Sequence, residues 1–319
     1  MAPIGTRPFV DRPARDTAAA TRLATTVAAD LGRPAPLLVN VGMNVVFATG
    51  DAVIRVSRPT APAAEAYALA DGLAAADIRV AAPFAGRIVA TADAGADDDD
   101  DDKVVPLVAT VWERLRAVGQ VDWVGVGAMV GALHRLDPAA APAGYPRPPC
   151  TTFPWWDFDR LLEQTAAVID RPAHRGLAEA VERHRGWIER SGAPASWVLC
   201  HGDVHPLNVI ATADGPAIID WDLLSVGPPA WDHGPLRSMI RYWGYPPSLY
   251  SDFGRGYGAD WSDDPVANAL TELRAVAATL LTVAAGRLDP TARAEADARL
   301  RHWRGEPDAP TWWHAGRAC

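Results

Sequence analysis

The segment HGDVHPLNVIATADGPAIIDWD, from His201 to Asp222, constrains the fold more than any other part of the chain. It contains two short apolar runs, VI and AII, separated by the polar connection ATADGP. Short apolar runs bounded by Gly, Pro and Asp are typical of strands joined by tight turns. The segment therefore predicts a strand, a polar loop and a hairpin, with carboxylates placed in the loop and at the end of the last strand.

The side chains of this segment are compatible with two kinds of metal chemistry. Zinc could be bound by His201, Asp203 and His205. However, Gly202 and Pro206 predict a loop, so the histidines do not share a helical face as in HExxH sites. Neither a cysteine nor a well-placed third histidine lies nearby, which makes zinc the weaker hypothesis.

Magnesium and phosphoryl transfer fit the same segment better. Such a reaction needs a carboxylate near the acceptor hydroxyl, oxygen ligands for Mg²⁺ and donors around the phosphates. Asp203 is followed five positions later by Asn208, and Asp220 ends the last apolar run. Carboxylate and amide oxygens are the hard ligands that Mg²⁺ prefers.

The rest of the chain divides into a β-rich part and a helical part. Residues 16–32 have helical periodicity, and a turn at Thr49–Asp51 separates two strand-like runs that suggest a hairpin. A helix near Glu65 and two further strands follow, and from Asp122 helical patterns dominate. We therefore expect an N-terminal lobe at 1–115 and a C-terminal lobe at 116–319, with the acidic run at 97–102 as a solvated loop.

HGDVHPLNVI, IIDWD and GPPAWD together resemble the aminoglycoside phosphotransferase and choline kinase-like family. The resemblance covers about residues 38–285, more weakly upstream. It implies an α+β, two-lobed protein-kinase-like fold, with a small antiparallel β-sheet and helices in the N-lobe and a larger, mainly α-helical C-lobe. It also implies that Asp203 is the catalytic base, that Asn208 and Asp220 bind Mg²⁺, and that His201 braces the loop.

The N-lobe residues expected at the nucleotide are less clearly marked. Gly42 and Asn44 lie in the loop that would cover the phosphates, without a GxGxxG pattern. Arg55 occupies the place where many kinases have Lys, and Glu65 could be its ion-pair partner; alternatively, both are surface charges. Glu113 lies where such folds bind adenine, although it could be only a surface charge.

Three residues after the catalytic segment are candidates for substrate contact: Asp222, Trp231 and Asp232. Asp222 could instead cap the following turn, and Asp232 could fix the segment after the metal-binding strand. Tryptophans are numerous, and core packing is their more frequent use. Scattered acidic residues in the C-lobe could attract a cationic acceptor, or they could form an ordinary acidic surface.

Composition restricts the partners. The net charge of −9 argues against nucleic-acid binding, and no apolar run is long enough to predict a membrane span. Cys150, Cys200 and Cys319 are too scattered to predict a disulfide framework, and the N-terminus lacks a secretory pattern. We expect a cytoplasmic protein without an obligate protein partner.

The resemblance implies a Mg²⁺-dependent kinase that transfers the γ-phosphate of ATP or GTP to a hydroxyl. The acceptor would be an aminoglycoside-like, amino-sugar or related small molecule, with antibiotic resistance as one biological outcome. The alternative is a non-catalytic, kinase-like protein that binds a nucleotide or another ligand. A protein kinase is excluded because HRD, DFG and APE are absent and only eleven residues separate Asn208 from Asp220.

Overall fold

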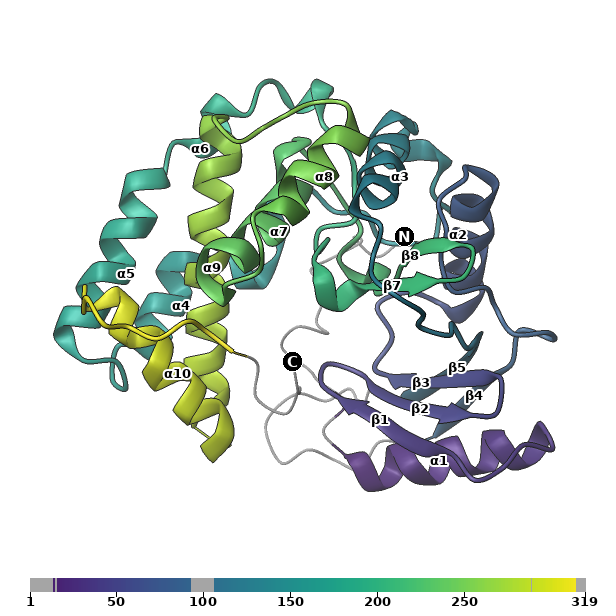
Figure 1. Ribbon diagram of the computed structural model, residues 1–319. Coiled ribbons are helices and arrows are strands. Elements are labelled where there is room, and N and C mark those ends of the chain that lie inside the picture. Colours follow the sequence, from purple (N-terminus) through teal and green to yellow (C-terminus); the bar gives the residue numbers. More distant parts are fainter. Residues whose placement is uncertain (1–13, 15, 93–105, 288, 314–319) are drawn as a thin grey trace.

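The computed structural model describes residues 14, 16–92, 106–287 and 289–313. A β-sheet lobe and a larger helical lobe lie side by side, with a small group of strands between them (Figure 1). The acidic run at 97–102 lies outside the described residues, as does Cys319.

The N-lobe is built around a five-stranded antiparallel sheet in the order β1-β2-β3-β5-β4. Helix α1 lies across one face of this sheet (Figure 1), and Asp16 caps its N-terminus. The register places Arg55 of β3 opposite Thr110 of β5. The elements of the lobe are α1 (Thr17–Asp30), β1 (Leu37–Val41), β2 (Val45–Thr49), β3 (Ala52–Ser57), α2 (Ala63–Ala75), β4 (Val89–Ala92) and β5 (Leu107–Glu113).

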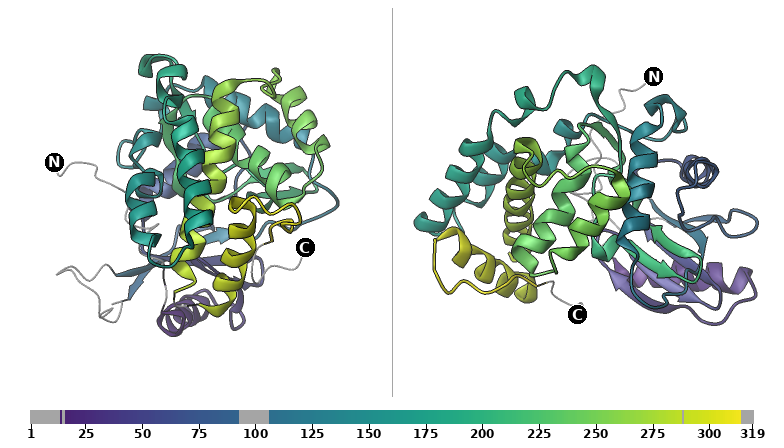
Figure 2. Two further views of the ribbon diagram at one scale, coloured as in Figure 1. Left: turned by 90° about the vertical axis from the view of Figure 1, so that its left-hand side faces the viewer. Right: turned by 45° about the horizontal axis from the view of Figure 1, so that its top comes forward.

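The C-lobe is mainly helical. Its α4, α5, α9 and α10 lie on the side away from the sheet, which the right-hand view of Figure 2 shows from a second direction. Its helices are α3 (Trp123–Arg135), α4 (Phe158–Thr165), α5 (Arg171–His184), α6 (Trp187–Arg190), α7 (Ala230–Trp243), α8 (Ser248–Tyr257), α9 (Pro265–Ala285) and α10 (Pro290–Trp303). Short 3-10 turns connect them: η2 (Pro138–Ala140), η3 (Cys150–Thr152), η4 (Pro154–Trp156), η5 (Pro194–Ser196), η6 (Pro206–Asn208) and η7 (Trp221–Leu223).

Two small antiparallel pairs lie between the sheet and the main helices (Figure 1). They are β6 (Val198–Cys200) with β9 (Ser225–Gly227) and β7 (Val209–Thr212) with β8 (Gly215–Ile218). The chain between these strands is the 201–222 segment singled out in the sequence. The predicted strand, loop and hairpin are therefore confirmed, as are the two-lobed α+β fold and the start of helical structure after Asp122.

The long helix α9 is the centre of the C-lobe core. By length and composition alone it could span a membrane, but 72% of its most apolar window is buried inside the protein. It packs against α4, α5, α6, α7 and α10. Burial on several sides accounts for its nearly continuous apolar sequence, as expected for the core helix of a globular lobe.

Candidate active site

The HGD loop leaves β6 through a backbone conformation that requires glycine. Gly202 has φ of +88°, and a Cβ atom there would lie 2.5 Å from the carbonyl oxygen of Leu223. Any other residue would be strained and would collide with backbone. Gly202 thus lets the loop turn closely against η7.

Asp232 of α7 anchors this loop through hydrogen bonds to its backbone. Its side chain is 0% exposed, and it accepts hydrogen bonds from the backbone N–H groups of His201 (2.8 Å) and Gly202 (2.6 Å). His134 of α3 lies 3.1 Å from Asp232 and 2.9 Å from the hydroxyl of Tyr257. The suggested substrate contact of Asp232 is therefore wrong, since all of its surroundings are protein, and the alternative scaffold role fits the geometry.

His201 is enclosed in the same loop. Its Nε2 lies 3.0 Å from the carbonyl oxygen of Ile219, and its Nδ1 accepts from the backbone N–H of Asp203 (3.1 Å). This arrangement assigns the proton to Nε2, and burial lowers the pKa of the imidazole. A neutral His201 so placed links the loop to the strand that carries Asp220, the position its predicted bracing role requires.

Asp203 lies among three polar side chains, those of Arg274, His205 and Asn208. Arg274 of α9 forms an ion pair with its Oδ1, His205 lies 3.3 Å from Oδ2, and Asn208 donates to Oδ2 at 3.0 Å. Burial alone would raise the pKa of Asp203, but the charges of Arg274 and His205 outweigh it and hold this pKa well below its usual value. Asp203 is therefore ionised at neutral pH.

Arg274 was missed by the sequence analysis. It lies 71 positions after Asp203, in a helix whose apolar pattern predicts core packing. A basic residue in a largely buried helix is the only local signal, and it does not specify a partner. Tertiary packing of α9 beside the HGD loop brings the two side chains together.

The remaining candidate site residues of the segment are Asn208, Asp220 and Asp222. Asn208 donates through Nδ2 to Asp203, so its Oδ1 accepts no hydrogen bond from the described residues. Asp220 has φ of +66°, a left-handed conformation uncommon outside glycine and often found at functional sites. Partial desolvation by the surrounding protein and the adjacent Asp222 carboxylate raise the pKa of Asp220 to about 7.

Arg55 reaches this carboxylate pair from the N-lobe. Its guanidinium forms an ion pair with Asp222 and lies 3.5 Å from Asp220. The predicted ion pair with Glu65 is wrong: Glu65 instead accepts from the backbone N–H of Gly144 at 3.3 Å. The carboxylates of Asp220 and Asp222 pair with Arg55 in place of the carboxylate of Glu65.

Of the remaining N-lobe candidates, only Asn44 contacts the 201–222 segment among the described residues, and Gly42 and Glu113 are exposed. Asn44 donates to Asp222 at 3.3 Å, so the β1–β2 loop reaches across to the C-lobe. Gly42 is exposed in the same loop, where a Cβ atom would make only ordinary contacts. Glu113 is exposed at the end of β5, and its backbone N–H donates to Ala82. Asp222 therefore joins the two lobes through its contacts with Arg55 and Asn44. No contact of Asp222 supports its predicted role in substrate binding.

The donor set fits Mg²⁺. Oδ1 of Asn208 and the carboxylate of Asp220 are hard oxygen ligands, and the Asp220 side chain is 44% exposed. Zinc is disfavoured further by the loop geometry. Among the described residues the one cluster with three zinc-type ligands is His134, Cys200 and Asp232, where both ring nitrogens of His134 already have partners.

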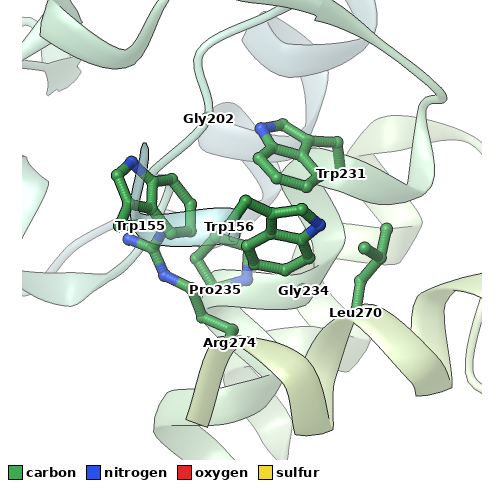
Figure 3. Close-up of a pocket in the computed structure, with 8 residues that line it drawn as sticks. All are labelled: Trp155, Trp156, Gly202, Trp231, Gly234, Pro235, Leu270 and Arg274. Carbon is green, nitrogen blue, oxygen red and sulfur yellow. The ribbon is translucent and has the colours of Figure 1, made fainter. Parts of the chain in front are cut away.

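Trp231 lies in a group of tryptophans in edge-to-face and tilted contact beside the HGD loop. Its ring centre is 4.6 Å from that of Trp156 and 5.8 Å from that of Trp155. These three side chains line a pocket that extends to Gly202 and Arg274 (Figure 3). The candidate active site thus has one side that contacts Arg55 and Asn44 of the N-lobe and a group of tryptophans within the C-lobe.

Residues 43–267 match the sequence model of the phosphotransferase enzyme family. This range includes the HGD loop, Asn208, Asp220 and Asp222, and it spans most of the chain. The chain belongs to the phosphotransferase enzyme family. No curated protein is significantly similar to it in sequence.

Solved structures of other phosphotransferases share the fold. A choline/ethanolamine kinase family protein from Mesorhizobium loti has a TM-score of 0.59 and 17% identity, over 92% of this chain and 95% of the other. The amicoumacin kinase hAmiN has a TM-score of 0.61 and 15% identity, over 87% and 90%. An aminoglycoside 2'-phosphotransferase in its GDP complex has a TM-score of 0.60 and 13% identity, over 91% and 99%. At such identities the similarity establishes only the fold of this member of the phosphotransferase enzyme family.

Proposed function

We propose that this phosphotransferase transfers the γ-phosphate of ATP or GTP to a hydroxyl group of a small molecule, with Mg²⁺ as cofactor. The observation that carries the proposal is the grouping of Asp203 with Asn208 through a hydrogen bond, and of Asp220 with Arg55 of the N-lobe through an ion pair, within one short segment. The complex of hAmiN contains AMP-PNP, and that of the aminoglycoside 2'-phosphotransferase contains GDP, which supports a nucleotide donor.

Asp203 orients the acceptor hydroxyl and takes its proton as the oxygen attacks the γ-phosphorus. The bond between this phosphorus and the β-phosphate oxygen breaks, and the nucleoside diphosphate leaves. Because its pKa lies well below the usual value, Asp203 stays ionised and acts more through orientation than through early proton removal.

Asn208 and Asp220 would hold Mg²⁺, which neutralises charge on the phosphate oxygens when it is bound. Arg55 turns from Asp222 and Asp220 toward these oxygens and provides a planar fork of donors. The β1–β2 loop with Asn44 and Gly42 would lie over the phosphates, and the backbone around Glu113 would contact the base. A cytoplasmic location, where nucleotides and reduced thiols such as Cys150 and Cys200 are expected, completes the proposal.

The test is a panel of hydroxylated acceptors assayed with ATP and with GTP. It includes aminoglycosides, amino sugars, choline, homoserine and hydroxy acids, and the readouts are nucleoside diphosphate release and a mass gain on the acceptor. With an accepted substrate, Asp203→Asn should lower kcat by about 10²–10⁴-fold, the usual contribution of a positioned base.

Nucleotide affinity of Asp203→Asn should stay close to that of the wild type, because Asn208 and Asp220 remain. Full turnover by this variant would refute the assignment of the base. Nucleotide binding without transfer to any acceptor would favour a non-catalytic, kinase-like binding protein instead.

A further inference from the structure

Asp222 is the point at which three separate segments of the N-lobe contact the 201–222 segment. Arg55 of β3 forms an ion pair with its Oδ2, and Asn44 of the β1–β2 loop donates to the same oxygen at 3.3 Å. Thr60, which lies between β3 and α2, donates to Oδ1 at 3.4 Å. Both oxygens of this buried carboxylate therefore have partners in the other lobe.

The counterions of Arg55 come from the C-lobe. Its Nη2 contacts Asp222 and lies 3.5 Å from Asp220, and the Arg55 side chain is 24% exposed. Glu65, the counterion expected within the N-lobe, accepts from the backbone N–H of Gly144 instead. The cation that the proposed function assigns to the phosphates is thus held by carboxylates of the opposite lobe.

The surroundings of this ion pair leave its charges less screened than those of an exposed pair. Water and salt screen exposed pairs strongly, whereas partly buried pairs are screened much less. Arg79 and Asp214 form an exposed ion pair between the same lobes, with their atoms 3.7 Å apart and their side chains 43% and 82% exposed. Compared with that pair, Asp222 is a strong competitor, which a phosphate group must displace before it can bind Arg55.

We infer that the ion pair of Arg55 with Asp222 is an autoinhibitory contact, in which the carboxylate occupies the guanidinium that binds the nucleotide phosphates. The inference rests on the proposed kinase function and specifies how the same site is regulated. Because carboxylate and phosphate compete for one cation, each lowers the affinity of Arg55 for the other. The hydrogen bonds from Asn44 and Thr60 hold the carboxylate in this position and so strengthen the contact.

The sign of the effect of one substitution tests the inference. Asp222→Asn keeps the size and an acceptor oxygen of the side chain but removes the charge that holds Arg55. Calorimetric titration of the full chain with AMP-PNP in the presence of Mg²⁺ measures the nucleotide affinity. Asp222→Asn should bind AMP-PNP at least about threefold more tightly than the wild type, an increase that even an exposed ion pair can account for.

A double-mutant cycle shows whether Asp222 acts through Arg55. Arg55→Gln should lower the affinity for AMP-PNP, because it removes a donor to the phosphates. In the Arg55→Gln background, Asp222→Asn should change this affinity by less than about twofold, since no guanidinium is left to release. Arg79→Gln and Asp214→Asn form the matched control cycle, and neither they nor their combination should change the nucleotide affinity, because this ion pair is exposed.

Unfolding of the same variants without nucleotide gives a second measurement. Urea denaturation followed by circular dichroism verifies that each variant is folded and measures the coupling between Arg55→Gln and Asp222→Asn. The two substitutions together should destabilise the chain less than the sum of their separate effects, because either one already breaks the ion pair. The exposed pair of Arg79 and Asp214 should show little coupling.

The inference is wrong if Asp222→Asn leaves the affinity for AMP-PNP unchanged or lowers it, since a loss would mean that Asp222 positions Arg55 or binds Mg²⁺. It is also wrong if the gain persists in the Arg55→Gln background, as a general effect of charge on phosphate binding would. In each of these cases, AMP-PNP binding by the wild type leaves the kinase proposal intact. Absence of AMP-PNP binding by the wild type and by every variant refutes the kinase proposal and the inhibition together, and coupling in the unfolding cycle would then retain the ion pair only as a contact between the lobes.

Discussion

Asp220 and Asp222 are two positions apart and have different surroundings. Asp222 is buried and contacts Arg55, Asn44 and Thr60, whereas Asp220 is 44% exposed and has a pKa raised to about 7. Arg55 neutralises part of the charge of both, but it lies closer to Asp222. Asp222 thus joins the lobes, and Asp220 is the carboxylate that remains available to a cation.

Replacing Asp220 by Ala should abolish the dependence of nucleotide binding on Mg²⁺. The substitution removes a ligand oxygen pair and leaves Asn208 alone, which is too little for a cation that demands octahedral oxygen coordination. Calorimetric titration with AMP-PNP, with and without Mg²⁺, measures the effect. We expect the affinity in Mg²⁺ to fall at least about tenfold, or about 1.4 kcal/mol.

The control is Asp214→Ala, which removes an 82% exposed carboxylate from the β7–β8 turn of the same segment. It should leave nucleotide affinity unchanged. Equal Mg²⁺ dependence in Asp220→Ala and the wild type would contradict the metal assignment.

At the scale of elements, the crossing of α3 and α8 determines where the HGD loop is anchored. A Cβ atom on Gly127 of α3 would overlap the carbonyl oxygen of Phe253, and one on Gly256 of α8 would overlap that of Val124. The two helices therefore approach backbone to backbone, as only glycine permits. This close packing positions His134 of α3 against Asp232 and hence supports the loop.

Gly127→Ala should lower the free energy of unfolding by about 1–3 kcal/mol, the usual cost of overpacking a core. Gly72→Ala is the matched control on α2, because no atom lies within 4 Å of its added methyl group. The control should raise stability by about 0.5–1 kcal/mol through helix propensity. Urea denaturation followed by circular dichroism measures both, and equal effects would refute the close-packing argument.

At the scale of the whole molecule, one buried carboxylate couples stability to pH. Glu272 lies in α9, where its two oxygens contact Arg183 (2.8 Å) and His184 (2.6 Å) of α5. Burial alone would raise its pKa, but hydrogen bonds from His184 and Arg183 outweigh burial and lower this pKa to about 2. The ionised form therefore ties two helices of the C-lobe core together.

Because the pKa of Glu272 is lower in the folded chain, its contribution is complete above about pH 4.5, the usual value. It is lost as the pH falls through about 2. Glu272→Gln should lower the free energy of unfolding at pH 7 by about 3 kcal/mol, and the difference should shrink toward acid pH. Urea unfolding from pH 7 to pH 3 measures it, with Glu179→Gln, at an exposed ion pair, as the control without effect. A pH-independent difference would contradict this account.

Much of the fold follows from local patterns in the sequence. Asp16 and Asp122 cap the helices that were expected to begin there, since an N-cap side chain satisfies backbone N–H groups within its own first turn. The β2–β3 hairpin and the strands around Asp203 and Asp220 were also predicted, because apolar runs and turn residues act over a few positions. The predicted partner of Arg55 and the predicted substrate contact of Asp232 were wrong, and the contact of Arg274 with Asp203 was not predicted.

The sequence by itself determined which polar groups of the candidate site lie together: Asp203, Asn208 and Asp220 belong to one segment, where chain geometry alone brings them close. Only the tertiary structure decided which residues stand opposite them. Arg55 meets Asp222 from 167 positions away, and Arg274 meets Asp203 from 71 positions away. Such pairs depend on the packing of whole helices and on how far burial strengthens a charge interaction, and neither is encoded in a local pattern.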